Sequence, residues 1–259
     1  MIREYITTGK CIWCGREKPL VSFRTAPHIV PKCLGGEEIG TDICDDCNHS
    51  FGTAVQGSPS VDSMFREVFE AYRFFLQLRT NEIKDSRRYK SCLFSYFRKT
   101  GIFKINNSYN LKTLTRQFKR SVFEVFLQKY HQETGDGNNP KFEAVRNFAR
   151  YNIGDLKLYY AFNNILLTEN TPTGFDEKVT IRTSQLTFDT MEKTGYFSLY
   201  LFGHKFYLEV LPLTASMYGE KYLRLQAGTS LVRVKGNESI RLVTSLKDID
   251  IFLDRFASK

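Results

Sequence analysis

Four of the six cysteines in this 259-residue chain form two pairs of the type Cys-x-x-Cys. The first pair is Cys11 and Cys14, and the second is Cys44 and Cys47. Each pair can form a tight turn that presents two thiolates, and two such turns complete the tetrahedral set of sulfur ligands that zinc prefers. Because four sulfur ligands leave no position open for water, we predict a structural zinc ion that stabilises a segment too small to fold alone.

The start of the chain bears on how these cysteines are interpreted. The sequence MIREYITTGKCIWC lacks a basic start followed by an apolar run, so we expect no signal peptide. No stretch approaches the roughly 18 to 20 apolar residues that span a bilayer. We therefore expect a cytoplasmic protein without a membrane segment, in which cysteines serve as thiols or metal ligands. Four thiols without a metal are the alternative, which burial alone explains poorly at such regular spacing.

A histidine and an asparagine lie close to the cysteine pairs in the sequence. His28 opens the segment HIVPKCLGG between the two pairs, and Asn48 directly follows the second pair in CDDCNHSFG. Together with CIWCG, and in this order, these segments resemble the HNH endonucleases of the ββα-metal fold that carry Cys-x-x-Cys pairs. The resemblance covers roughly residues 8–55 and does not extend to the rest of the chain.

The resemblance implies metal-dependent hydrolysis of phosphodiester bonds in nucleic acid, which we expect to be DNA. Such a reaction needs a base that activates water and a divalent ion that neutralises charge on the phosphate. His28 suits the role of the base because an imidazole titrates near neutral pH. By the resemblance, Asn48 binds the catalytic ion, Mg²⁺ or another divalent cation, through its amide oxygen.

Two positions depart from the family pattern. Pro27 stands directly before His28, where the family usually has an acidic or histidine metal ligand, and proline cannot coordinate. The asparagine that orients the base has no clear counterpart, and Thr41 or Asp42 lies nearest to its position. Asp42 and His49 are candidates to compensate as ligands of the catalytic metal. An alternative class therefore stays open, a non-catalytic nucleic-acid-binding protein on a zinc-stabilised HNH scaffold.

The positive charge of the chain is concentrated in one segment. The formal net charge is +9, and residues 84–130 contain twelve Lys and Arg against two Asp and Glu. Aromatic residues interleave with these cations in RRYK and YFRK, a pattern that suits phosphate contacts and base stacking. A solvated basic face without a partner is the alternative. The candidates for contact with nucleic acid are Arg87, Arg88, Lys90, Arg98, Lys99, Arg116, Lys119 and Arg120.

Three zones of different composition predict an α+β fold. Residues 1–58 form the zinc-stabilised ββα-metal module and end in the boundary-like stretch GTAVQGSPS. Residues 59–153 are predicted to be a helical basic region because apolar side chains recur at helical spacing, beginning after a cap at Ser60 or Asp62. Residues 154–259 change to a two-residue period, which predicts a mostly antiparallel β-rich C-terminal domain.

The C-terminal zone contains one clear hairpin signal. YFSLYLF and KFYLEVL alternate in character and are separated by Gly203 and His204. His131 and His204 have no partner nearby in the sequence, so we expect both at the surface. Further strands are expected at LKLYYAF, KVTIRTS, YLRLQ, SLVRVKG and SIRLVTS, with a short helix at DIDIFLDRF.

No motif in the C-terminal zone identifies its role. We expect it to recognise a nucleic-acid sequence, a modified base, a ligand or a partner protein, or to form a homo-oligomer that activates the nuclease. Stand-alone HNH proteins with an extra domain resemble restriction or phage-defence nucleases, and a role in phage defence is expected by that analogy alone.

Overall fold

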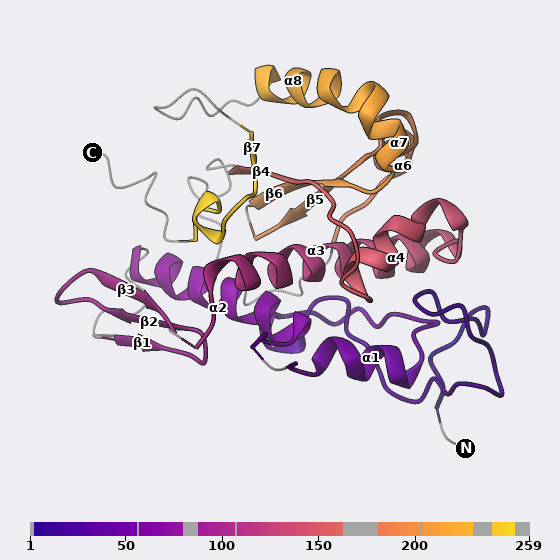
Figure 1. Ribbon diagram of the computed structural model, residues 1–259, viewed down its shortest axis with the longest axis horizontal. Helices are drawn as coiled ribbons and strands as arrows, with labels where there is room; N and C mark the ends of the chain where they lie inside the picture. The colour runs from indigo at the N-terminus through magenta and orange to yellow at the C-terminus, as the bar shows by residue number, and fades with distance from the viewer. Residues whose placement is uncertain are drawn as a thin grey trace.

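The computed structural model places two long helices between an N-terminal module and a C-terminal sheet (Figure 1). The helices are α2 (Val61–Arg79) and α3 (Leu111–Thr134). Helices and antiparallel sheets are mixed as the sequence predicted. No helix among the described residues is both long and apolar enough to pass through a lipid bilayer. The structure describes residues 3–55, 57–79, 88–106, 108–162, 181–202, 204–229 and 240–251.

The N-terminal module has little regular structure. An isolated antiparallel bridge pairs His28 with Ile39, and η1 (Lys32–Leu34) lies in the connection between them. Helix α1 (Asp45–Gly52) follows, so two short extended segments precede a helix, in the order expected of a ββα module. The ring of Trp13 packs edge-on against Phe51 of α1 at 4.9 Å between ring centroids, which joins the first cysteine turn to the helix.

Both long helices of the middle zone lie where apolar periodicity predicted them. Ser60 precedes α2 and accepts a hydrogen bond from the Ser63 backbone N–H at 3.1 Å, which makes it the N-terminal cap. Asn110 caps α3 in the same way, and α3 ends before Gly135, whose φ of 70° suits a residue without a side chain. α3 is buried along most of its length.

A three-stranded antiparallel sheet, which the sequence did not predict, interrupts the mainly helical middle zone. Its strands are β1 (Arg88–Lys90), β2 (Phe94–Phe97) and β3 (Ile102–Ile105), in the order β1-β2-β3. One face of this sheet is aromatic and packs on α2, with Tyr89 4.9 Å from Phe74 between ring centroids. The strands are too short for the two-residue period to be recognised, and the contact with α2 is long-range.

The predicted helical region ends with η2 (Pro140–Phe142) followed by α4 (Glu143–Ala149). Beyond it lies a four-stranded antiparallel sheet in the order β5-β6-β4-β7. Its strands are β4 (Leu158–Phe162), β5 (Tyr196–Leu201), β6 (His204–Glu209) and β7 (Arg241–Leu242). The predicted hairpin is confirmed because β5 and β6 pair directly, with Leu201 opposite His204.

Helices flank this sheet, and one of them corrects a predicted strand. They are α6 (Gln185–Thr194), α7 (Pro212–Thr214), η3 (Ala215–Gly219) and α8 (Glu220–Thr229). YLRLQ belongs to α8, where Tyr222 and Leu223 pack on Tyr196 and Tyr207 of the sheet, so a helical face and not a strand buries these side chains.

The remaining predictions for the C-terminal zone are covered only in part. Residues 181–184 of KVTIRTS form no strand, and SIRLVTS contains β7. The start of DIDIFLDRF overlaps η4 (Leu246–Asp248). Residues 178–180, 230–239 and 252–259, which hold the rest of these segments and SLVRVKG, lie outside the described residues.

One large buried apolar cluster includes side chains from Cys11 through to Ile251. Phe118 and Phe126 of α3 contact Phe206 and Phe197 of the C-terminal sheet, so this helix joins the sheet to the rest of the chain. Contrary to expectation, His131 and His204 are buried, with 2% and 1% of their surfaces exposed. The sequence did not indicate this burial, because the partners of both residues are distant in the sequence.

Candidate active site and metal centre

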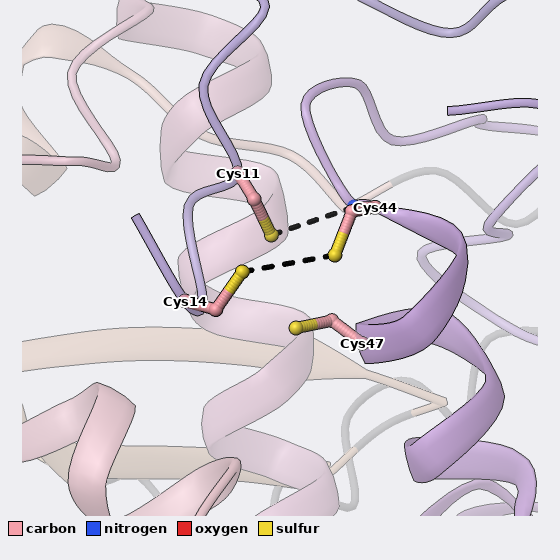
Figure 2. A group of neighbouring side chains, drawn as sticks. All are labelled: Cys11, Cys14, Cys44 and Cys47. Atoms are coloured by element: carbon pink, nitrogen blue, oxygen red, sulfur yellow. Dashed lines mark hydrogen bonds between the residues drawn. The ribbon is translucent and has the colours of Figure 1, made fainter. Parts of the chain in front are cut away.

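The four cysteines of the two pairs converge on one point (Figure 2). Their sulfur atoms all lie within 4.8 Å of one another, and Cys14 Sγ is 3.7 Å from Cys44 Sγ. A tetrahedral zinc ion with Zn–S bonds of about 2.3 Å requires sulfur atoms about 3.8 Å apart. The arrangement therefore fits the predicted structural zinc ion.

Two arginines border the sulfur atoms. Arg16 Nε donates to Cys14 Sγ at 3.4 Å, and Arg150, at the end of α4, donates to Cys47 Sγ at the same distance. Four thiolates around a divalent ion leave net negative charge, which guanidinium groups offset. Arg150 thus connects the N-terminal module to the helical layer.

Asp45, the first residue of α1, holds the loop that leads to His28. Its carboxylate accepts hydrogen bonds from the backbone N–H groups of Arg24 and Thr25 and from the hydroxyls of Ser22 and Thr25, at 2.6 to 2.8 Å. Burial opposes ionisation, but these hydrogen bonds outweigh it and hold the pKa of Asp45 below its ordinary value. The loop is thereby fastened to the helix that carries Asn48.

The same network orients the side chain of Asn48. Its amide nitrogen donates to Thr25 Oγ1 at 3.1 Å, while the Thr25 hydroxyl donates its own proton to Asp45. Because that hydroxyl can only accept from Asn48, the amide nitrogen must face Thr25. The amide oxygen, the atom that can bind a cation, makes no hydrogen bond to any residue that the structure describes.

His28 sits in a short antiparallel ladder. Ile29 N–H donates to Glu38 C=O at 3.0 Å, and Gly40 N–H donates to Pro27 C=O at 2.7 Å, so both neighbours of His28 are fixed. The imidazole itself is half-buried and has neither a hydrogen bond nor an ion pair with the described part of the chain. It is therefore free to bind a water molecule or a substrate.

The local geometry requires a glycine at both Gly35 and Gly36, for a different reason at each position. Gly35 has a φ of 87°, a left-handed conformation that a side chain disfavours. At Gly36 a Cβ atom would lie only 1.9 Å from the Val30 carbonyl oxygen. The Gly-Gly pair is thus required for the chain to return from His28 to the bridge at Ile39.

His28 and Asn48 line one cavity of about 470 Å³. Pro27 forms part of its wall and offers no ligand atom. The structure therefore brings together the two residues for which catalysis was predicted, and their catalytic roles stay predictions. The cavity is not closed by the N-terminal module alone, because α2 and α3 supply the rest of its wall.

The other two candidates for the catalytic metal lie elsewhere. Asp42 is fully buried and accepts hydrogen bonds from Thr7, Thr8 and Gly9 N–H groups and from His131 Nε2 at 3.0 Å. Burial is outweighed by these bonds, which hold its pKa well below the ordinary range. His49 is exposed and points to Thr53, with 3.2 Å between its Nε2 and the hydroxyl. Neither residue lines the cavity, so we propose neither as a ligand.

Two acidic residues that the sequence did not predict as site residues line the cavity instead. Asp62 is in the first turn of α2, and Glu124 is in the middle of α3. Their carboxyl groups are hydrogen-bonded to each other. Burial raises the pKa of Asp62 to about 6, and burial next to Asp62 raises the pKa of Glu124 well above its ordinary value. Both carboxyl groups therefore keep their protons to a higher pH than exposed carboxyl groups do.

The basic residues predicted to contact nucleic acid divide into two groups. On α3, Lys119 and Arg120 are buried, and they bond to Asp155 at 2.7 Å and to the Ala149 carbonyl at 2.9 Å. Arg116 bonds to Asn152 at 2.6 Å. These side chains hold α3 against the residues after α4, and we no longer include them in the nucleic-acid surface.

The second group lies on the small sheet. Arg88, Lys90, Arg98 and Lys99 are exposed, whereas Arg87 lies outside the described residues. The strand register aligns Lys90 with Ser95 and Ser95 with Lys104, so the two lysines share the face opposite the aromatic one. Lys104 was missed because the strands themselves were not predicted.

Residues 11–60 match a family model described as HNH endonuclease. By this match the N-terminal segment is similar to HNH endonucleases, as its sequence motifs predicted, and its cysteine cluster fits a zinc-stabilised version of that module. No curated protein and no solved structure matches the chain. The matched segment contains His28 and Asn48 but ends before Asp62 and Glu124.

Proposed function

We propose that this chain is a metal-dependent HNH endonuclease that hydrolyses phosphodiester bonds in DNA. One observation carries the proposal: the unbonded imidazole of His28 and the oriented amide oxygen of Asn48 line the same cavity beside the cysteine cluster. The match of residues 11–60 to HNH endonucleases supports the class of reaction.

Each residue at the cavity has a distinct role in this proposal. A bound divalent cation supplies charge neutralisation at the phosphate and the leaving oxygen. His28 takes a proton from the attacking water, and Asn48 offers its amide oxygen to the cation. Lys32 and Arg66 also line the cavity, where their positive charges suit phosphate oxygens.

The exposed lysines of the small sheet extend the surface for DNA. Phe75 of α2 contacts that sheet, and it lies thirteen residues after Asp62, about 20 Å along the helix at 1.5 Å per residue. In this proposal, a duplex with one phosphate at the cavity mouth also contacts Lys90 and Lys104. Such contacts are to phosphates and add affinity without sequence preference.

Nicking of supercoiled plasmid tests the proposal. Zinc-loaded wild-type protein should nick the plasmid with Mg²⁺ or Mn²⁺, and His28→Ala should lower the rate at least a hundredfold with zinc content unchanged. His49→Ala is the matched control, because His49 belongs to the same module but faces away from the cavity. Equal rates for wild type and His28→Ala would refute the role of His28.

A non-catalytic DNA-binding protein is the second candidate function. It is favoured by Pro27, which occupies the cavity wall next to His28 without a ligand atom. Binding to a labelled duplex should then persist in a chelator too weak to remove zinc, and no substrate should be cut. Cleavage that requires Mg²⁺ or Mn²⁺ excludes this candidate.

Several broader expectations stay predictions. These are the cytoplasmic location, the role in phage defence, and the domain boundaries after residues 58 and 153. An activating partner or self-assembly through the C-terminal zone also stays a prediction, which a mass measurement in solution would test. A strict monomer would argue against activation by self-assembly.

A further inference from the structure

The carboxyl pair in the cavity lies where the N-terminal module meets the long helices. Asp62 comes from α2, and Glu124, with 7% of its surface exposed, comes from α3. Both residues are outside the segment that matches HNH endonucleases. They share the cavity with the free amide oxygen of Asn48 and the free imidazole of His28.

Nothing in the described chain fully neutralises this pair. Arg66 attracts Asp62 and Arg120 attracts Glu124, but neither guanidinium forms a salt bridge with these carboxylates among the described residues. Two carboxylates in one cavity repel each other, because their charges are poorly screened there. A divalent cation held between them would neutralise both groups at once.

Neighbouring groups orient both carboxylates. Gln128 Nε2 donates to Glu124 Oε1 at 2.9 Å, while the buried Oε1 of Gln128 has no partner within the described residues. The Gln128 amide therefore donates a hydrogen bond to Glu124 although its own oxygen stays unsatisfied. Such a donated bond favours the ionised form of the Glu124 carboxylate. If Gly52 carried a Cβ atom, that atom would lie 3.5 Å from Asp62 Oδ2. Gly52 lies one turn of α1 after Asn48. Asp62 therefore faces the side of α1 that carries Asn48.

We propose that Asp62 and Glu124 bind the divalent cation of the active site together with Asn48. This inference rests on the proposed nuclease function and adds ligands to it from the helical layer. Mg²⁺ and Mn²⁺ prefer hard oxygen ligands, and Mg²⁺ is commonly held by one or two carboxylates while water and phosphate oxygens fill the other positions. Two carboxylates and an amide oxygen at one cavity provide such a set.

Binding of Mn²⁺ alone tests the inference without any cleavage assay. Free Mn²⁺ is measured by electron paramagnetic resonance during titration into zinc-loaded protein. Asp62→Asn and Glu124→Gln should each weaken Mn²⁺ binding at least tenfold, a loss typical of altered metal sites. Glu133→Gln is the matched control, because Glu133 lies on the same helix outside the cavity and is 39% exposed. It should bind Mn²⁺ as the wild type does.

The failure of this inference differs from failure of the proposed function. Unchanged Mn²⁺ affinity in both variants overturns the inference, even if the wild type cuts DNA. Wild-type protein that binds Mn²⁺ through Asp62 and Glu124 but cuts no nucleic acid leaves the inference standing and contradicts the nuclease proposal. Circular dichroism and zinc content of each variant confirm that the fold is retained.

A second measurement needs no variant and so does not depend on folding of the substituted chains. Fe²⁺ in place of Mn²⁺, with ascorbate and peroxide, generates hydroxyl radicals that cut the backbone near the bound ion. Cuts in wild-type protein should fall near residues 48, 62 and 124. Cuts at 48 without cuts near 62 and 124 would overturn the inference.

Discussion

The N-terminal module and the helix pair α2–α3 line one cavity but differ in how much polar contacts contribute to their shape. The module buries apolar side chains such as Trp13 and Phe51, and polar contacts add to this packing: four converging sulfur atoms, the carboxylates of Asp42 and Asp45, and a Gly-Gly turn. In the helix pair, aromatic and aliphatic side chains are buried along both helices. Regular secondary structure is scarce in the first region and dominant in the second.

The difference shows where precision and robustness come from. Polar and metal contacts have strict geometry, so they can hold His28 and Asn48 in defined positions. Apolar burial is less directional and is spread over many side chains, so a helix tolerates the cost of an acidic residue such as Glu124. Polar side chains of the helices can thus serve a site that the module alone leaves incomplete.

The largest expected effect separates the two regions by their dependence on zinc. Removal of zinc by a strong chelator removes about 10 kcal/mol of binding free energy from the module. Amide hydrogen exchange over residues 11–52 should become fast, while α3 should keep its protection because apolar packing supports it. The double variant Cys44→Ser/Cys47→Ser should show the same fast exchange as the zinc-free protein. The control Cys33→Ser/Cys92→Ser, at exposed cysteines outside the pairs, should exchange as the wild type does. A loss of protection in α3 as large as that in residues 11–52 would contradict the proposed difference between the two regions.

The second prediction concerns pH and Asp62. In the unfolded chain this carboxyl ionises near pH 4, whereas burial keeps it protonated in the folded chain up to a pKa of about 6. The folded state therefore binds more protons between these values, and stability falls as pH rises through that window. Asp62→Asn removes the ionisation, so the stability of this variant should exceed that of the wild type by about 3 kcal/mol at pH 7 and by only about 1 kcal/mol at pH 4.5.

Urea unfolding of zinc-loaded protein without Mg²⁺ measures this difference. Asp189→Asn is the control, because Asp189 is exposed on α6 and far from any buried acid pair. Its stability should follow the wild type at every pH. A constant difference between Asp62→Asn and the wild type across the window would show that Asp62 is not protonated in the folded state.

The third prediction concerns the small sheet that packs on α2. The double variant Lys90→Gln/Lys104→Gln should weaken duplex DNA binding about tenfold near 0.1 M salt and reduce the slope of log affinity against log salt by about two. Fluorescence anisotropy across a salt series measures both quantities. Lys193→Gln/Lys221→Gln removes the same charge from exposed positions in the C-terminal zone and should change neither. Equal effects of the two double variants would mean that net charge, and not this sheet, attracts DNA.

The smallest expected effect lies in the hydroxyl of Thr25. Thr25→Val removes the link between Asn48 and Asp45, which costs about 1 kcal/mol and should lower kcat about fivefold. KM and zinc content should change little. Thr25→Ser retains the hydroxyl and should restore the rate, a rescue that a mere packing role would not give. A Ser variant as slow as Val would contradict the orienting role.

Local patterns in the sequence were sufficient for the parts that local physics determines. The cysteine spacing predicted the four converging sulfur atoms, and apolar periodicity predicted α2 and α3. Alternation around Gly203 predicted the pairing of β5 with β6. His28 and Asn48 were singled out because HIVPKCLGG and CDDCNHSFG, together with the cysteine pairs, resemble the motifs of HNH endonucleases.

The parts that the sequence did not reveal depend on contacts between distant segments. Glu124 and Arg120 look like surface residues of an amphipathic helix, but α3 is covered on all sides by α2, the module and the C-terminal sheet. Asp62 looks like an ordinary acidic residue in the first turn of a helix. The partner of His131 is Asp42, 89 positions earlier in the chain. No local pattern indicates such partners.

The central position of α3 has a consequence for how this N-terminal module can be inherited or transplanted. Residues 11–60 are a recognisable unit in sequence, but Glu124 of α3 closes their cavity and His131 holds Asp42 from the same helix. A chimera that received only the recognisable unit would carry the motif and part of the cavity wall. In exchange between genes, the unit that preserves the site therefore extends at least to the end of α3.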